Sequence, residues 1–245
     1  DAGAHGGSVE LTDGTIDIQA NGFWVDGHVV ISGELDCSAR TGNITMGSLD
    51  LASGGTFKAP GGDTTLNSEN SDKVLKINGS STFTAGTGTI VVTTADDSIL
   101  DCDPAAGSFN NLTFNASSQT FTLEKNLTIG GNLTITAGEL DTVNSGGTDW
   151  TLTVTGDVDI ATAGTLTTNA SAIIIGALSC VGSALYNATT NANGTIITSR
   201  HSALGRGLSC GSVDRVTHNN GKFVFQGAST GTQGILINGA ASSTK

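Results

Sequence analysis

The sequence contains few of the residues that are abundant in helical or in disordered proteins. Of its 245 residues only 13% are charged and 4% aromatic, and it has two prolines, one methionine and five glutamates. Helical proteins are typically rich in Ala, Leu, Glu, Lys and Arg together. Disordered chains carry more charge and more proline. The composition therefore argues against both classes.

Basic residues and long apolar runs are scarce as well. Ten Lys and Arg face 22 Asp and Glu, which gives a net charge of −12. Binding to nucleic acid or to an anionic membrane needs clustered cations, and the sequence has no such cluster. It also has no run of eighteen apolar residues of the kind that spans a bilayer. We expect no nucleic-acid partner and no membrane insertion.

Glycine, threonine, serine and asparagine are abundant, with 35 glycines, and apolar residues alternate with threonine. In residues 127–129 and 133–135 a leucine and an isoleucine flank one threonine. Side chains in a strand point alternately to opposite faces, so this pattern predicts strands with one buried face and one threonine-rich face. The glycine and asparagine between the runs favour tight turns. The sequence therefore predicts an all-β protein.

Short words repeat along the chain. Asn-Leu-Thr-Ile occurs at 126–129 and 132–135, and Asn-Leu-Thr-Phe at 111–114. The word Thr-Ala-Gly begins at residues 84, 136 and 162, which is two periods of 26 residues and then one. These repeats predict a parallel β-solenoid with coils of about 26–31 residues, in which each coil is stabilised by its neighbours. The alternative is one or more β-sandwich domains. The scarcity of large aromatics favours the narrow solenoid.

The repeat pattern also suggests how the chain is organised. Residues 1–50 fit the period poorly and are expected to be an N-terminal cap or attachment region. Residues 51–245 are expected to be the solenoid, less regular after residue 180. No linker rich in proline or serine divides the chain.

Four cysteines are disulfide candidates. Cys180 and Cys210 are 30 residues apart, about one predicted coil, so they could lie on adjacent coils within bonding reach. Cys37 and Cys102 fit the period less well. The sequence predicts a Cys180–Cys210 bridge, with four buried free thiols as the alternative. No Cys-x-x-Cys pair points to zinc.

The densest acidic stretch is a weak candidate for a calcium site. Asp96, Asp97, Asp101 and Asp103 offer hard oxygen ligands of the kind that Ca²⁺ takes, but without the spacing of an EF-hand. A solvated loop is the competing interpretation. We expect no other cofactor.

Nothing in the sequence singles out an active site. Glu139 and Asp141 could serve as the paired carboxylates of a polysaccharide-cleaving enzyme, or could be two solvent-facing residues that flank a buried Leu140. Asn-x-Ser/Thr sequons occur nine times, as expected in a chain so rich in these residues. The protein is expected not to be an enzyme.

Residues 82–168 resemble a known kind of repeat. The stretches TFTAGTGTIVV, FNNLTF, LTIGGNLTITAGEL and TLTVTGDVDI are similar to a repeat of bacterial surface proteins and of structural proteins of marine tailed phages, and residues 216–227 resemble the start of another unit. The resemblance implies β-solenoid repeats in fibres, decoration proteins or adhesins. It implies no catalytic residue, and residues 1–50 depart from it.

Composition and resemblance together predict an extracellular structural or attachment protein. The favoured expectation is a fibre, spike or capsid decoration on a virion surface. The alternatives are a bacterial adhesin or filament subunit and, third, a polysaccharide-degrading spike enzyme. We expect a homo-oligomer or an assembly with other virion or surface proteins, with glycans as candidate ligands.

Overall fold

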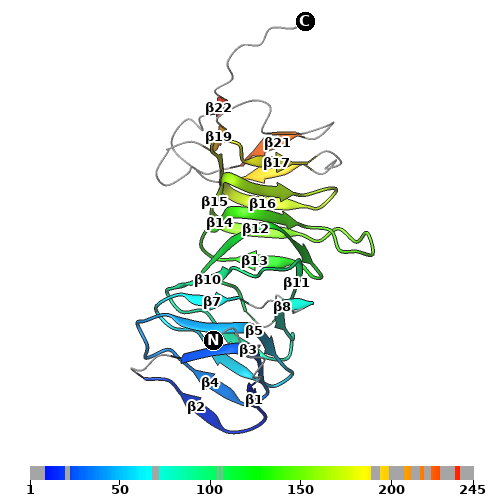
Figure 1. Ribbon diagram of the computed structural model, residues 1–245. Helices are drawn as coiled ribbons and strands as arrows, with labels where there is room; N and C mark the ends of the chain where they lie inside the picture. Colours follow the sequence, from blue (N-terminus) through cyan, green and yellow to red (C-terminus); the bar gives the residue numbers. More distant parts are fainter. Residues whose placement is uncertain are drawn as a thin grey trace, which may run out of the picture.

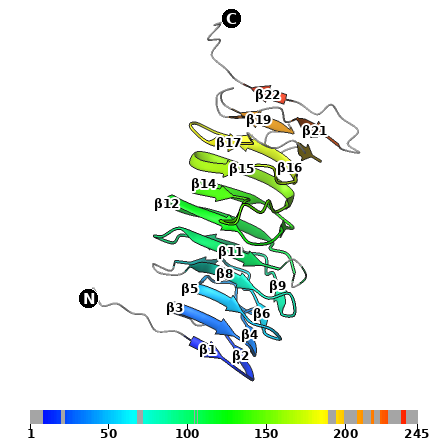
Figure 2. The same cartoon turned by 90° about the vertical axis from the view of Figure 1, so that its right-hand side faces the viewer.

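The computed structural model shows a parallel β-solenoid (Figures 1 and 2). It describes residues 9–19, 23–67, 72–103, 105, 107–188, 194–198, 207–210, 216–217, 222–226 and 235–237. All ladder pairings between its strands are parallel, which excludes the β-sandwich. In chain order the strands are β1 (Val9–Leu11), β2 (Thr15–Asp17), β3 (Phe23–Ile31), β4 (Glu34–Asp36), β5 (Ile44–Leu51), β6 (Thr56–Lys58), β7 (Thr64–Leu66), β8 (Lys73–Ile77), β9 (Thr82–Thr84), β10 (Thr89–Val92), β11 (Ser98–Cys102), β12 (Asn111–Leu123), β13 (Leu127–Ile129), β14 (Leu133–Asp141), β15 (Leu152–Thr167), β16 (Ile173–Cys180), β17 (Leu185–Asn187), β18 (Thr195–Ile197), β19 (Leu208–Cys210), β20 (Val216–Thr217), β21 (Phe223–Phe225) and β22 (Ile235–Ile237).

Each turn of the chain adds one strand segment to each of three stacked faces, and the long strands bend from one face to the next. Face A consists of β2, β4, β6, β9, β13, the first parts of β15 and β16, β18 and β21. Face B consists of the first parts of β3, β5, β12 and β14, with β7, β10, the middle of β15, the end of β16, β19 and β22. Face C consists of β1, the second parts of β3, β5, β12 and β14, with β8, β11, the end of β15, β17 and β20.

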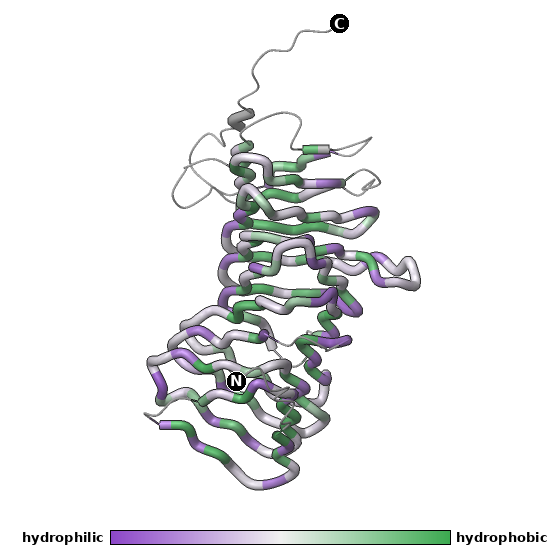
Figure 3. The backbone as a smooth tube through the Cα atoms, viewed as in Figure 1, coloured by the Kyte–Doolittle hydropathy of each residue, from purple (hydrophilic) through white to green (hydrophobic). Residues whose placement is uncertain are grey.

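The core is a continuous set of apolar columns along the axis. On face A, Leu35, Phe57 and Phe83 stack in register and are buried. Ring contacts at 5.8 Å and 5.1 Å extend this column from Phe57 through Phe83 to Phe109, and Phe109 pairs with Ile129. Apolar segments recur at the same positions along the tube in Figure 3. The predicted alternation of inward apolar and outward polar residues is confirmed.

The outward side of face B carries the expected threonine row. Thr45 pairs with Thr65, and Thr113 pairs with Thr134, so that their side chains lie on the solvent side of successive coils. Val91 stands between these two pairs in the same row. The row results from the period of two, because the residues on either side of each threonine point into the core.

Coil length varies more than the sequence pattern predicted. Face B partners are 20 residues apart between Ile44 and Thr64, 26 between Thr64 and Ile90, and 30 between Leu178 and Leu208. The coil from Ile44 to Thr64 is thus shorter than the expected 26–31 residues, as are those from Ile90 to Leu112 and from Leu112 to Leu133. The three strand segments keep their size, while the corners between them differ in length. The stack also passes without a break across residue 50, since β3 pairs with β5 and β5 with β7.

Candidate functional site

The corner between faces A and B carries a row of polar side chains that join successive coils. Asn43 Oδ1 accepts a hydrogen bond from the Asp63 N–H at 2.9 Å, and Asp63 Oδ1 accepts one from the Thr89 N–H at 3.1 Å. Further along, Asn111 Oδ1 accepts from the Asn132 N–H and Asn132 Oδ1 from the Asp157 N–H, both at 2.9 Å. We call these residues the corner row. Their side chains satisfy backbone N–H groups that the turn leaves without a strand partner.

Glycines lie directly before the corner row and let the coils approach closely. A Cβ on Gly62 would lie 2.6 Å from the carbonyl carbon of Gly42, and one on Gly88 would lie 1.9 Å from the Gly62 oxygen. A Cβ on Gly156 would lie 2.6 Å from the Gly131 oxygen. Such distances exclude any side chain unless the backbone shifts. At these three positions the spacing of the coils requires glycine.

The corner row explains the repeated word of the sequence. In 111–114 and 132–135 the asparagine belongs to the corner, the leucine and the last residue point inward, and the threonine points outward, with the two words stacked in register. The word at 126–129 serves another corner, where Asn126 Oδ1 accepts from the Thr151 N–H at 2.9 Å. The Asn-x-Thr sequons at these positions follow from the architecture.

The predicted repeat of Thr-Ala-Gly is right for only two of its three copies. Ala137 and Gly138 pair with Ala163 and Gly164. Thr84, in the first copy, instead pairs with Lys58 on face A. The first copy therefore lies at a different position in its coil.

The carboxylates of the acidic stretch, proposed above as calcium ligands, have several separate partners. Asp101 accepts from Lys73 Nζ at 2.7 Å and lies 3.3 Å from Lys125 Nζ, which is 3.5 Å from Asp103. Asp97 Oδ1 accepts the Thr120 N–H at 2.6 Å. Among the described residues no three His, Cys, Asp or Glu side chains gather as metal ligands. The carboxylates that were predicted to share an ion, Asp96, Asp97, Asp101 and Asp103, are used instead in separate contacts or face solvent.

Ion pairs between coils account for most of the lysines. Burial of Asp101 opposes its ionisation, but the Lys73 and Lys125 ammonium groups outweigh this and lower its pKa. Lys58 Nζ lies 2.5 Å from Glu34 and 2.8 Å from Asp36 on the preceding coil. The hydrogen bonds from Lys58 and Ser38 lower the pKa of Asp36 to about 2. Lys76 contacts Asp50 in the same way at 2.8 Å. Exposed pairs of this kind contribute little each to stability, but every one of them joins two coils.

The cysteines are four buried free thiols. Cys180 and Cys210 are register partners on face B and share a thiol hydrogen bond, so the prediction that they lie on adjacent coils is confirmed. The predicted bridge between them is not found, since both thiols are free in this structure. Cys37 follows β4 on face A and Cys102 ends β11 on face C, so these two do not pair. Burial raises the pKa of Cys37 to about 11 and raises that of Cys102 further.

A polar groove lies at the surface, at the corner between faces B and C. It has a volume of about 380 Å³. The residues that line it are Ser117, Ser118, Gln119, Thr120, Gly138, Glu139, Ala163 and Thr165. Hydroxyl, amide and carboxylate groups dominate this lining, and it contains no aromatic ring. We refer to this feature as the 117–120 groove.

Glu139 and Asp141 lie on the outward side of face C with Leu140 buried between them, as one of the two interpretations predicted. Glu139 lines the 117–120 groove and accepts from Thr167 Oγ1 at 2.5 Å. Asp141 accepts from the Val143 N–H at 3.0 Å and from Asn169 at 2.8 Å, and burial raises its pKa. The two carboxylates thus have separate hydrogen-bond partners.

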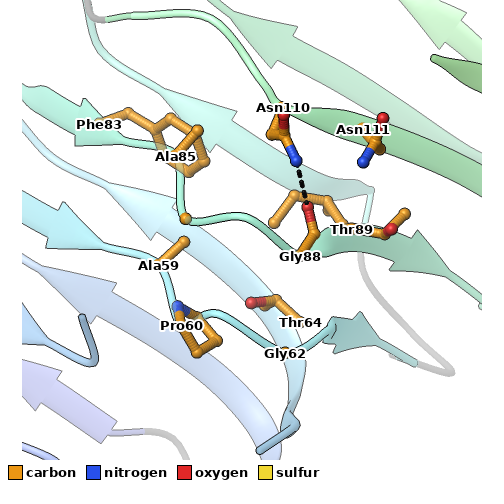
Figure 4. A pocket seen from close by; sticks show the side chains of 12 residues that line it. Ala59, Pro60, Gly62, Thr64, Phe83, Ala85, Gly88, Thr89, Asn110 and Asn111 are labelled. Atoms are coloured by element: carbon orange, nitrogen blue, oxygen red, sulfur yellow. Dashed lines mark hydrogen bonds between the residues drawn. The ribbon is translucent and has the colours of Figure 1, made fainter. Parts of the chain in front are cut away.

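A second, smaller and partly open hollow lies beside the corner row (Figure 4). Its volume is about 10 Å³, enough for one water molecule at most. Thr64, Phe83 and Ala85 line it, and the buried Thr64 hydroxyl has no protein partner. Asn110 closes its rim by donating to the Gly88 carbonyl oxygen at 3.2 Å. The space is a packing defect too small for a ligand.

Comparison of the chain with protein-family models, with curated proteins and with solved structures gives no match. No helix long and apolar enough to cross a membrane occurs in the described part of the chain.

Proposed function

We propose that this chain is a non-enzymatic structural rod that holds a contact surface away from the particle or cell that carries it. The favoured setting is a virion fibre, spike or capsid decoration, outside the cell. The observation that carries the proposal is the unbroken stacking of three parallel faces, joined from coil to coil by the core columns, the corner row and the lysine ion pairs. A solenoid built this way grows in length by adding coils without changing its cross-section.

The side chains of the rod are largely committed to its own cohesion. The corner row bonds to backbone N–H groups of the next coil, and Lys58, Lys73, Lys76 and Lys125 bond to carboxylates of neighbouring coils. Contacts between coils are a sufficient explanation for the presence of the corner-row side chains and of these lysines. This supports a scaffold over the third alternative, a polysaccharide-degrading spike enzyme.

The 117–120 groove is the part of the rod that we assign to contact. Its hydroxyl, amide and carboxylate groups can exchange hydrogen bonds with the hydroxyls of a glycan. Because the groove lies at a corner, its rim can change without disturbing the three faces. Glycan contact through this groove fits an attachment role on either a virion or a cell surface.

The test of the setting is fractionation of the native source. Virus-like particles and cell envelopes are separated on a density gradient, and the polypeptide is quantified in each fraction by mass spectrometry. Enrichment with particles supports the virion proposal, and the ratio to the major capsid protein separates a many-copy decoration from a fibre present in few copies. Enrichment with envelopes or shed filaments would favour the alternative, a bacterial adhesin or extracellular filament subunit.

The test of the groove uses purified protein on immobilised glycans. The double variant Gln119→Ala and Glu139→Ala removes two hydrogen-bonding side chains from the groove, and Thr45→Ala on the flat outward side of face B is the control. We expect loss of retention in the double variant only. Release of carbohydrate fragments from host polysaccharide would instead support the enzyme alternative.

A further inference from the structure

The N-terminal end of the rod presents strand edges without a described partner. Among the described residues β1 pairs only with β3, β2 only with β4, and residues 23–25 of β3 only with β5. The Gly14 oxygen accepts from the Glu34 N–H and the Ile18 N–H donates to the Asp36 oxygen. Backbone groups of a parallel strand alternate in direction, so those of Thr15 and Asp17 point away from β4. This edge is a template for one more parallel strand.

Among the described residues, no coil covers the core at the same end. Ile16 belongs to the face A column whose next members are Leu35 and Phe57. Leu35 is 2% exposed and Phe57 0%, whereas Ile16 is 37% exposed. The side chain therefore has the position of a core residue with a described neighbouring coil on one side only.

The C-terminal end has the complementary arrangement. The last strands β20, β21 and β22 pair with β17, β18 and β19, and no described strand lies on their other edges. Phe225 pairs with Ile197 and so continues the column that begins at Ile16, and it is only partly buried. The Gln226 N–H donates to the Ile197 oxygen, so the backbone groups of Phe225 point away from β18.

The two ends match in the order of their faces. The first described coil runs through face C (β1), face A (β2) and face B (β3). The last runs through face C (β20), face A (β21) and face B (β22). A first coil placed on a last coil would therefore continue the same winding, with Ile16 over Phe225.

The described residues at the two ends also differ in charge. Those from 9 to 36 include six Asp and Glu and no Lys or Arg, whereas those from 207 to 237 include Lys222 and no Asp or Glu. Glu10 and Asp17 on the first coil are exposed, as is Lys222 immediately before β21. Opposite charge favours contact between unlike ends, and like charge opposes contact between two N-terminal ends.

We propose that copies of this chain stack head to tail, with the N-terminal coil of one copy on the C-terminal coil of the next, so that the three parallel faces continue across the joint. Such a contact is heterologous and does not close, so it produces linear filaments. The proposal rests on the structural role given above and deepens it by naming the partner of the rod ends.

The test uses two variants that each block one end. The head-blocked variant carries Glu10→Lys and Asp17→Pro, which removes acidic charge and the outward N–H of residue 17. The tail-blocked variant carries Lys222→Glu and Phe225→Pro, which replaces a basic residue by an acidic one and removes the outward N–H of residue 225. Wild type is expected to form a concentration-dependent series of oligomers in sedimentation velocity, and each variant alone is expected to stay monomeric. In an equimolar mixture the head-blocked variant supplies an intact C-terminal end and the tail-blocked variant an intact N-terminal end. The mixture should therefore give dimers and nothing larger.

Controls separate end stacking from misfolding and from general charge effects. Asp96→Lys makes a similar charge change in the middle of the rod and should leave assembly unchanged. Glu10→Lys with Asp17→Lys keeps the backbone intact and should shorten the filaments, while far-ultraviolet circular dichroism checks that every variant keeps its strands. A monomeric wild type, or dimers formed by the tail-blocked variant alone, would overturn the proposal. Either result leaves the fractionation test of the structural role unaffected.

Discussion

Adjacent glycines in one turn provide a sharp test of why the corner needs glycine. Gly61 and Gly62 precede β7 and contribute equally to the flexibility of the unfolded chain. A Cβ on Gly62 would lie 2.6 Å from the Gly42 carbonyl carbon and 2.7 Å from Asn43 Oδ1. A Cβ on Gly61 would meet nothing nearer than the Arg40 oxygen and Thr87 Oγ1, both at 3.4 Å. The two alanine substitutions should therefore have opposite effects on stability.

The size of each effect follows from these distances. Alanine at Gly62 forces two coils apart, and overpacking of this kind costs about 1–3 kcal/mol. The loss of unfolded-state entropy returns about 0.4–1 kcal/mol in both variants. Gly62→Ala should thus be destabilised by about 1–2 kcal/mol, which lowers the melting temperature by about 2–8 °C in a chain of this size. Gly61→Ala should be neutral or more stable by up to about 1 kcal/mol.

The assay is equilibrium unfolding in urea, followed by far-ultraviolet circular dichroism, with the two variants and wild type measured side by side. Unchanged slopes with a lower midpoint for Gly62→Ala alone would support the close approach of the coils. Equal midpoints for the two variants would refute it, because the same residue change would then have the same effect with and without the contact.

Three further predictions follow from the core, the ion pairs and the thiols. Phe83→Ala removes the middle ring of the Phe57–Phe83–Phe109 column and should destabilise the protein by about 3–5 kcal/mol in the same urea assay, whereas Thr82→Ala, exposed on the same strand, should change little. The depressed pKa of Asp36, about 2 in the folded state against 3.8, means that its contribution to stability is present above pH 4 and is lost as the pH falls towards 2. Lys58→Met should flatten this part of the pH profile of the urea midpoint, and an unchanged profile would show that the Lys58 contact does not hold the carboxylate ionised. The four buried thiols should react with an aromatic disulfide reagent at least about a hundred times more slowly in the folded protein than in denaturant, and rapid labelling of the native state would contradict their burial.

The strands were predictable from the sequence because their cause is local. Alternation of Leu, Thr and Ile over residues 127–129 is enough to specify one inward and one outward side. The position of Cys180 beside Cys210 on adjacent strands was also predictable, since the coil that separates them has the predicted length.

The register of most other coils was not predictable from spacing. The corners vary in length, so the number of residues between two strands does not show which residues pair. The excursion between β14 and β15, closed by the bridge of Val143 to Asp149, lengthens one coil without altering its strands. The corner row was hidden for a related reason. Asn110 takes the place of glycine before Asn111, and Thr89 takes the place of Asn or Asp, so no single motif marks every coil. The ion pairs of the acidic stretch were not predictable either, because Lys73 and Lys125, the partners of Asp101, come from neighbouring coils.

The direction of the hydrogen bonds between coils has a mechanical consequence. In a parallel solenoid these bonds run along the axis, so a pull on the two ends loads all three faces of a coil interface at once. A force applied to a single terminal strand breaks the bonds of that strand first and then those of the next. A rod of this kind is therefore strong against tension shared over its whole end and weak against peeling. A durable joint must grip an entire coil, while a single engaged strand would make a joint that releases under load.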